Sequence, residues 1–219
     1  MDTDQLIRSL AADNAQRAQP VGIVLALALM AATPVSTAML LIGLGIRPDI
    51  WLAVRNPFFD LKFVVTTALA IPALIISLHL SRPEASLHGW SWLLIAPVLV
   101  LVGGIVAEMM VPQRAPMMAR LVGHNSMLCV SAIPVLSLPL LAAALFGLRH
   151  GAPSRPALAG AIAGLVSAGL AATLYAAHCT DDSPLFVATW YTIAALVVAG
   201  LGAGIGARVL RYCCTRARS

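Results

Sequence analysis

The stretch that decides the fold is Ala176-Ala177-His178-Cys179-Thr180-Asp181-Asp182-Ser183-Pro184-Leu185-Phe186-Val187-Ala188-Thr189-Trp190-Tyr191. On each side of it lies an apolar run of about twenty residues, the length that crosses the hydrocarbon core of a membrane. The stretch therefore predicts a tight polar turn between two membrane helices. It carries an imidazole, a thiol and two carboxylates but no Lys or Arg, and a turn that only joins two helices does not need this set of reactive side chains.

The composition is that of an integral membrane protein. Of 219 residues, 60% are hydrophobic and 11% are charged, and the mean hydropathy is +0.90, whereas globular proteins carry about 25% charged residues. The first apolar segment is long enough to cross the bilayer, so we expect a retained span and not a cleaved signal peptide. The net charge of +5 comes mainly from Arg outside the apolar runs, which indicates contact with anionic lipid and no direct nucleic-acid binding.

Six apolar segments predict six transmembrane helices. They cover residues 21–43, 61–80, 91–108, 127–147, 156–177 and 186–207, and the loops between them are rich in Pro, Gly and charge. These loops are too short for a soluble domain. The predicted fold class is therefore all-α: an integral membrane bundle of six helices over residues 21–207, preceded by a segment at 1–20 and followed by a basic tail at 208–219.

The distribution of basic residues predicts the orientation of the bundle. The side of the two termini carries nine of them: Arg8, Arg17, Arg82, Arg149, Arg155, Arg208, Arg211, Arg216 and Arg218. The opposite side carries five: Arg47, Arg55, Lys62, Arg114 and Arg120. Because Lys and Arg are enriched in cytoplasmic loops, we expect both termini in the cytoplasm.

The segment at 1–20 contains a short amphipathic pattern. Leu6, Ile7, Leu10 and Ala11 share one face of a predicted helix. A helix of this length is not stable by itself. Two interpretations stay open: an interfacial helix on the inner leaflet, or a docking peptide that places this face in a groove of a partner protein.

Two cysteines fall at the outer surface in this topology. Cys129 lies near the start of the fourth span, and Cys179 lies just past the end of the fifth. At about 1.5 Å per residue their depths differ by about 7 Å, and a disulfide needs Cα atoms within about 7 Å of each other. The topology thus permits a disulfide without requiring one. Cys213 and Cys214 follow the last span on the cytoplasmic side, where thiols stay reduced.

Other candidate metal ligands share the outer face with these cysteines. They are His124, His178, Asp181, Asp182, Met109, Met110, Met117 and Met118. Thiol, imidazole and thioether groups suit copper(I) or zinc, although the spacing matches no standard metal motif. The structural alternative is a buried Cys129, lipid-facing methionines, and Asp182 or Ser183 as the cap of the sixth helix before Pro184. That alternative leaves His178-Cys179 unexplained.

The sequence carries no signature of a familiar enzyme. HExxH, Walker and GxSxG motifs and paired intramembrane carboxylates are all missing from it, so we do not expect an enzyme. Lys62 and Glu108 lie near span ends and the other charges lie in loops, which disfavours an ion-coupled transporter.

Five stretches carry a resemblance to a known family: Asp2–Ala11, Arg55–Lys62, Cys129 with Ile133–Pro139, Arg149–Pro156 and His178–Tyr191. In these stretches the sequence resembles the NrsF-type family of six-span bacterial anti-sigma factors. Together they are spread over nearly the whole chain. The last is the most specific, because hydrophobic bias alone does not produce such a polar-aromatic string. The Cys213-Cys214 pair is not required by the family pattern.

The resemblance implies a multi-pass protein of the bacterial inner membrane that sequesters an extracytoplasmic-function sigma factor. In this family the cytoplasmic N-terminal segment is thought to hold the sigma factor, and two outward-facing cysteines are thought to sense metal or oxidant. These roles fall here on the Leu6, Ile7, Leu10 and Ala11 face and on Cys129 and Cys179.

On this hypothesis, oxidation or metal binding at the two cysteines shifts the fourth and fifth helices and weakens the hold on the sigma factor. His124, His178 and Asp181 are candidates for the same metal site or for its support. The only cofactor implied is a transient copper or other soft metal ion. The alternative function is a small transporter or metal-uptake protein whose entrance is the outer cluster of Cys, His and Met.

Overall fold

The computed structural model describes residues 3–5, 20–82, 89–112 and 116–211. The helices are α2 (Val21–Gly43), α3 (Ile50–Ala53), α4 (Pro57–Leu80), the 3₁₀ turn η1 (Ser91–Leu94), α5 (Ile95–Met110), α6 (Met117–Val122), α7 (Ser126–Leu148), α8 (Pro156–Ala176), α9 (Pro184–Phe186), the π-helical turn η2 (Val187–Tyr191) and α10 (Thr192–Val209). Residues 3–5 are also helical. The described part of the chain contains no strand, as the sequence predicts.

Six segments are long and apolar enough to cross a membrane, which confirms the number predicted. They are Val21–Gly43, Pro57–Leu80, Ser91–Met110, Met117–Leu148, Pro156–Ala176 and Pro184–Val209. The second begins four residues before the expected start, because Asn56 caps it by accepting a hydrogen bond from the Phe58 N–H at 3.1 Å, and Pro57 fits the first helical position.

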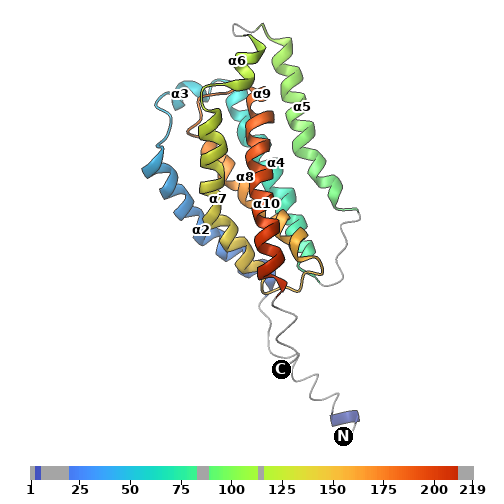
Figure 1. The fold of residues 1–219 in the computed structure, drawn as a ribbon. Coiled ribbons are helices and arrows are strands. Elements are labelled where there is room, and N and C mark those ends of the chain that lie inside the picture. Colours follow the sequence, from blue (N-terminus) through green and yellow to red (C-terminus); the bar gives the residue numbers. More distant parts are fainter. Residues whose placement is uncertain (1–2, 6–19, 83–88, 113–115, 212–219) are drawn as a thin grey trace.

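The two ends of the bundle are built from different elements. The start of α2 and the end of α10 lie at one end, which we call the proximal end, and α3, α6 and α9 lie at the other, the distal end (Figure 1). An even number of spans requires this arrangement. The side of the membrane that each end faces stays a prediction, and Leu6, Ile7, Leu10, Ala11, Cys213 and Cys214 lie outside the described residues.

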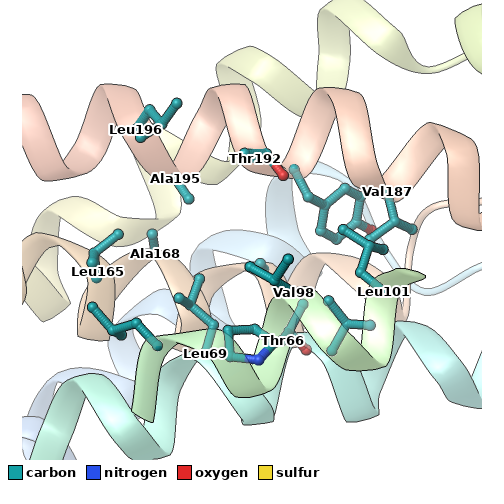
Figure 2. Close-up of a pocket in the computed structure, with 15 residues that line it drawn as sticks. Thr66, Leu69, Val98, Leu101, Leu165, Ala168, Val187, Thr192, Ala195 and Leu196 are labelled. Atoms are coloured by element: carbon teal, nitrogen blue, oxygen red, sulfur yellow. The ribbon is translucent and has the colours of Figure 1, made fainter. Parts of the chain in front are cut away.

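Helix α8 is the centre of the bundle. It packs against α10, α4 and α7, while α2 covers the outer side of α7. Helix α5 stands at the edge, with its main contacts on α4 and α9 (Figure 1). A cavity of about 170 Å³ lies between α5 and the rest of the bundle (Figure 2).

Glycines allow α8 and α10 to touch backbone to backbone. Gly160 and Gly164 of α8 face Gly202 and Gly206 of α10, and a Cβ on Gly164 would lie 2.6 Å from the carbonyl oxygen of Val198. Gly160 and Gly164 form a GxxxG motif, which serves close packing inside the bundle.

We predict that Gly164→Ala destabilises the bundle by about 1–3 kcal/mol, because the new methyl group meets backbone that cannot move aside. Thermal unfolding in detergent measures the effect. Gly200→Ala is the matched control in α10, since a Cβ there meets nothing within 4 Å. Equal unfolding temperatures for the two variants would contradict the prediction.

Candidate functional site

The turn between α8 and α9, residues 177–183, is held at the distal end by backbone contacts. The His178 and Cys179 N–H groups both donate to the Tyr175 carbonyl, at 2.9 and 3.0 Å, which closes the last turn of α8. The loop after α2 binds from the side. The Arg47 N–H donates to the Ala177 carbonyl at 3.2 Å, and His178 Nδ1 lies 3.0 Å from the Gly45 carbonyl oxygen.

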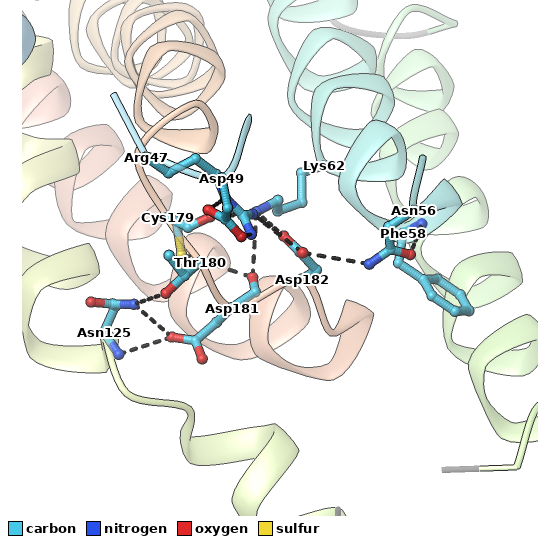
Figure 3. A network of polar contacts seen from close by, with 10 residues as sticks. All are labelled: Arg47, Asp49, Asn56, Phe58, Lys62, Asn125, Cys179, Thr180, Asp181 and Asp182. Carbon is cyan, nitrogen blue, oxygen red and sulfur yellow. Dashed lines mark hydrogen bonds and ion pairs between the residues drawn. The ribbon is translucent and has the colours of Figure 1, made fainter. Parts of the chain in front are cut away.

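Asp182 is the centre of a buried polar network (Figure 3). Its Oδ1 atom lies 2.6 Å from Lys62 Nζ and 2.9 Å from Arg47 Nη1. The same two cations donate to the carbonyl oxygen of Cys179, Lys62 at 2.8 Å and Arg47 at 3.3 Å. Asn56 Nδ2 reaches the other Asp182 oxygen at 3.4 Å. The network therefore joins the ends of α2, α4 and α8 to one turn.

Both cations of this network are removed from solvent. Lys62 is 1% exposed and Arg47 is 6% exposed, and the Phe59 ring lies within 5.4 Å of Arg47 Cζ and 5.1 Å of Lys62 Nζ. Buried cations are tolerated only when paired and hydrogen-bonded. Asp182 is thus held in place by two cations that water does not reach and that have to be paired within the protein.

Asp49 completes the coordination of Arg47. Its two carboxylate oxygens accept from Arg47 Nε and Nη2, each at 2.8 Å, in a bidentate pair. These hydrogen bonds lower the pKa of Asp49 to about 2 and raise the pKa of Arg47. The pair is therefore intact through the neutral range, and its contribution is lost only as the pH falls toward that value.

Asp181 caps the start of α7. Its carboxylate accepts from the backbone N–H groups of His124 and Asn125, at 3.1 and 2.9 Å, and from Asn125 Nδ2 at 3.0 Å. A carboxylate at a helix N-terminus satisfies backbone donors that have no partner within the helix. One turn therefore positions the span that carries Cys129 as well as the residue Cys179.

A second ion pair fastens α5 and α6 to the same end. Glu108, 3% exposed, lies 3.0 Å from Arg120 Nη1 and accepts from Ser183 Oγ at 2.7 Å. Trp190 Nε1 donates to the Leu121 carbonyl at 2.9 Å. The residues just before and within the sixth span thus bind the loop that precedes α7.

Asp182 and Ser183 do not cap the sixth span, which corrects the structural interpretation of the sequence. Pro184 is the first helical residue as expected, and Ser183 occupies the cap position but makes no side-chain cap bond. Its hydroxyl bonds Glu108 instead, and the Asp182 carboxylate binds Lys62 and Arg47. The physical reason is that a buried cation attracts a carboxylate more strongly than a neutral N–H group does.

Cys129 and Cys179 lie in one hydrophobic cluster and are both free thiols with no exposed surface. Tyr175 and Tyr191 belong to the same cluster, and their hydroxyls have no hydrogen-bond partner among the described residues. The Cys179 Sγ–H faces the Asp181 carbonyl at 3.8 Å. Burial raises the pKa of the Cys179 thiol and the nearby charge of Lys62 opposes part of that rise, so the thiol is protonated at neutral pH.

The candidate metal ligands have separate contacts. The His124 side chain is 96% exposed and its Nδ1 lies 3.6 Å from Asp181, His178 faces Gly45, and Asp181 caps α7. Met109, Met110, Met117 and Met118 are exposed. Within residues 3–5, 20–82, 89–112 and 116–211, no three His, Cys, Asp or Glu side chains are grouped as a metal site would need.

Comparison with known proteins shows the family of the chain. A family model described as negative regulator of sigma F, NrsF, matches residues 10–212. The chain belongs to the NrsF family. It is 36% identical to the anti-sigma-F factor NrsF of Caulobacter vibrioides (strain NA1000 / CB15N) over 215 residues, which are 97% of this chain and 100% of that protein.

A second relative covers the same length. The probable anti-sigma-F factor NrsF of Azospira oryzae (strain ATCC BAA-33 / DSM 13638 / PS) is 34% identical over 97% of this chain and 100% of its own. No solved structure matches the chain. The family is one of regulators of transcription and not of enzymes, which confirms both the resemblance and the expectation that the chain is no enzyme.

Sequence reasoning missed the residues that organise the site. Arg47, Lys62 and Glu108 were counted only as loop or span-end charges, and the two tyrosines were not singled out. A signal was present for Lys62, since it is the only lysine of the chain and follows the apolar Phe58-Phe59 pair within a span. A buried lysine needs a carboxylate, but nothing in the sequence says which one.

We predict that Lys62→Met lowers the free energy of unfolding by about 3 kcal/mol, the low end for breaking a buried pair because Arg47 still faces Asp182. Chemical denaturation in detergent measures the loss. Arg55→Met, at an exposed position before the same helix, is the control. A Lys62→Met protein as stable as the Arg55→Met control would refute the prediction.

Proposed function

We propose that this chain is a membrane anti-sigma factor that holds an extracytoplasmic-function sigma factor and releases it when Cys129 and Cys179 are oxidised or bind a metal. The observation that carries the proposal is the double role of Cys179. Its thiol lies in the buried cluster with Cys129, and its carbonyl accepts from Lys62 and Arg47. A change at the thiol therefore acts on the network that fastens the distal end.

The partner follows from the family. The family model describes a negative regulator of sigma F, and both relatives are named as anti-sigma-F factors, one of them as probable. We assign the docking role to residues 1–20, through Leu6, Ile7, Leu10 and Ala11, with the bundle at 21–207 as the anchor and 208–219 as a basic tail. A sigma factor acts inside the cell, which agrees with the excess of basic residues on the side of the termini.

The chemical step at the cysteines is a two-electron oxidation. Both thiols lose a proton, the oxidant takes up two electrons, and an S–S bond of about 2.05 Å forms. A soft metal ion such as copper would instead replace the two thiol protons. Either event changes the position of Cys179 Sγ, which now faces the Asp181 carbonyl, and so pulls on the turn at 177–183.

A route to the proximal end runs along α7 and α2. Cys129 lies in the first turns of α7, and α7 packs along α2, where Ser36 Oγ donates to the Leu136 carbonyl at 2.9 Å. Near the proximal end Gly147 approaches Leu25 so closely that a Cβ on the glycine would lie 2.8 Å from the Leu25 Cα. A tilt of α7 therefore moves the start of α2, which follows residues 1–20 in the sequence.

A covalent bond or a metal–thiolate bond supplies the free energy needed to release the sigma factor. Moving a two-state hold from mostly closed to mostly open needs a difference of about 5.5 kcal/mol between the two states. Formation of a covalent S–S bond or of two metal–thiolate bonds supplies this difference, and it must also offset the charge-assisted hydrogen bonds that the Cys179 carbonyl loses when it leaves the two buried cations. One neutral hydrogen bond would not suffice.

The alternative of a transporter receives no support from the site. Lys62 and Glu108, the charges expected within the apolar segments 61–80 and 91–108, are bound to Asp182 and to Arg120 with Ser183. Paired charges at span ends form a fastening and not a path for ions.

We predict that the double variant Leu6→Asp with Leu10→Asp abolishes co-purification of the sigma factor with the full-length membrane protein, because two carboxylates would be placed on the apolar face. The matched control is Gln5→Asp with Ser9→Asp, which adds the same charge to the opposite face of the predicted helix. Equal loss of binding in the two proteins would attribute the effect to charge and not to the face, and undiminished binding by the first would sink the docking role.

We predict that Cys129→Ser and Cys179→Ser each leave the sigma factor bound when cells are treated with a soft metal salt or an oxidant, since neither variant can form the disulfide or the two-thiolate site. Transcription from a sigma-dependent reporter measures release. The control is Cys213→Ser with Cys214→Ser, which should respond as the unmodified protein does. Release in the Cys179→Ser protein at the normal dose would refute the sensing role.

A further inference from the structure

The cavity beside α5 is a feature of the bundle that the proposed function does not use. Its volume is about 170 Å³, and its walls come from α4, from η1 and the start of α5, from α8, and from η2 with α10 (Figure 2). Six of the lining residues are Leu69, Val98, Leu165, Ala168, Ala195 and Leu196. The walls are therefore drawn from four of the six spans.

The chemistry of the walls is that of a hydrocarbon site. Aliphatic side chains dominate, and the hydroxyl of Thr66 is already engaged, donating to the Lys62 carbonyl at 2.9 Å and accepting from Thr173 Oγ1 at 2.9 Å. A buried water needs two to four polar partners, whereas apolar cavities of about 150 Å³ stay dry and take up molecules such as benzene. The cavity thus favours an apolar occupant.

The cavity opens toward the side of the bundle and not toward either end. At its rim Val98 of α5 is 56% exposed and Leu196 of α10 is 64% exposed. Leu196 is twelve residues after Pro184, about 18 Å along the sixth span, which is near the middle of a hydrocarbon layer about 30 Å thick. What lies next to this opening in a membrane is the acyl region of the lipids.

One wall has an unusual backbone. The π-helical turn Val187–Tyr191 contributes Val187 and Tyr191 to the lining, immediately before Thr192 and Ala195 of α10. Single π turns inside α-helices are frequent at functional sites, because the extra residue re-aims the side chains around it. Here it turns Tyr191, 5% exposed, into the space between the cavity and the buried cluster of Cys129 and Cys179.

We propose that this cavity binds the acyl chain of a membrane lipid, inserted sideways between α5 and α10. A lipid acyl chain lies next to the opening at this depth, and it is aliphatic like the side chains of the walls. It restores the dispersion contacts that an empty cavity lacks. The weak attachment of α5, whose main contacts are with α4 and α9, leaves the side toward α10 open for it.

The test uses the full-length protein in nanodiscs that contain a phospholipid with a photoactivatable diazirine near the middle of one acyl chain. After illumination, mass spectrometry maps the adducts. We expect adducts at Leu165 and Ala168, which lie inside the cavity, at several times the level found on Leu27, an ordinary exposed residue of α2. Adducts on Leu27 but not on the two cavity residues would overturn the proposal.

Two filling variants and a control separate binding from general lipid contact. Ala168→Leu and Ala195→Leu fill the cavity from opposite walls, and each should remove the adducts inside it while Leu27 is labelled as before. Gly204→Leu places a leucine on α10 where an added Cβ meets nothing within 4 Å, and it should leave the labelling of the cavity unchanged. Unchanged cavity labelling in both filling variants would refute the site, and if one variant fails to fold, the other and the unmodified protein still decide.

Discussion

The distal end of this molecule depends on one carboxylate between two buried cations. Asp182 holds Lys62 and Arg47, and the same cations hold the carbonyl of Cys179. In a bilayer the lipid offers neither cation an alternative partner, so these contacts fix the position of the turn at 177–183 in the described structure. The ends of α2, α4 and α8 are fastened by electrostatics, while the rest of the bundle is held by close apolar packing.

These two kinds of attachment respond differently to change. Helices such as α8 and α10, in contact through glycines, resist displacement because interiors are close-packed. A hydrogen-bonded turn can exchange partners with little change in packing. On the proposed function, the distal turn is the element that converts a chemical event at a thiol into a shift of whole helices.

Most of the fold could be predicted from the sequence, and much less of the site. Hydropathy located six spans, five of them to within four residues, since each span must satisfy its own backbone hydrogen bonds in lipid. The partners of Asp182 could not be predicted, because Arg47 and Lys62 lie more than a hundred residues away and their meeting depends on how the spans are arranged. The π turn at 187–191 depends on packing against α7 and α9 and has no local signal. The topology of the fourth and fifth spans put Cys129 and Cys179 at one end of the bundle, and the reaction of the two thiols with each other stays a prediction.

The complete burial of the two thiols limits how fast they can react with a reagent in water. A reagent in water meets neither sulfur while the turn at 177–183 is closed. Reaction then waits for local opening, and when opening is rarer than the chemistry, the protein's own fluctuation sets the pace for every reagent alike. A brief exposure to a stressor would modify few molecules, whereas a sustained exposure would let modified molecules accumulate. The protein would therefore respond to the total duration of the stress and not to its onset.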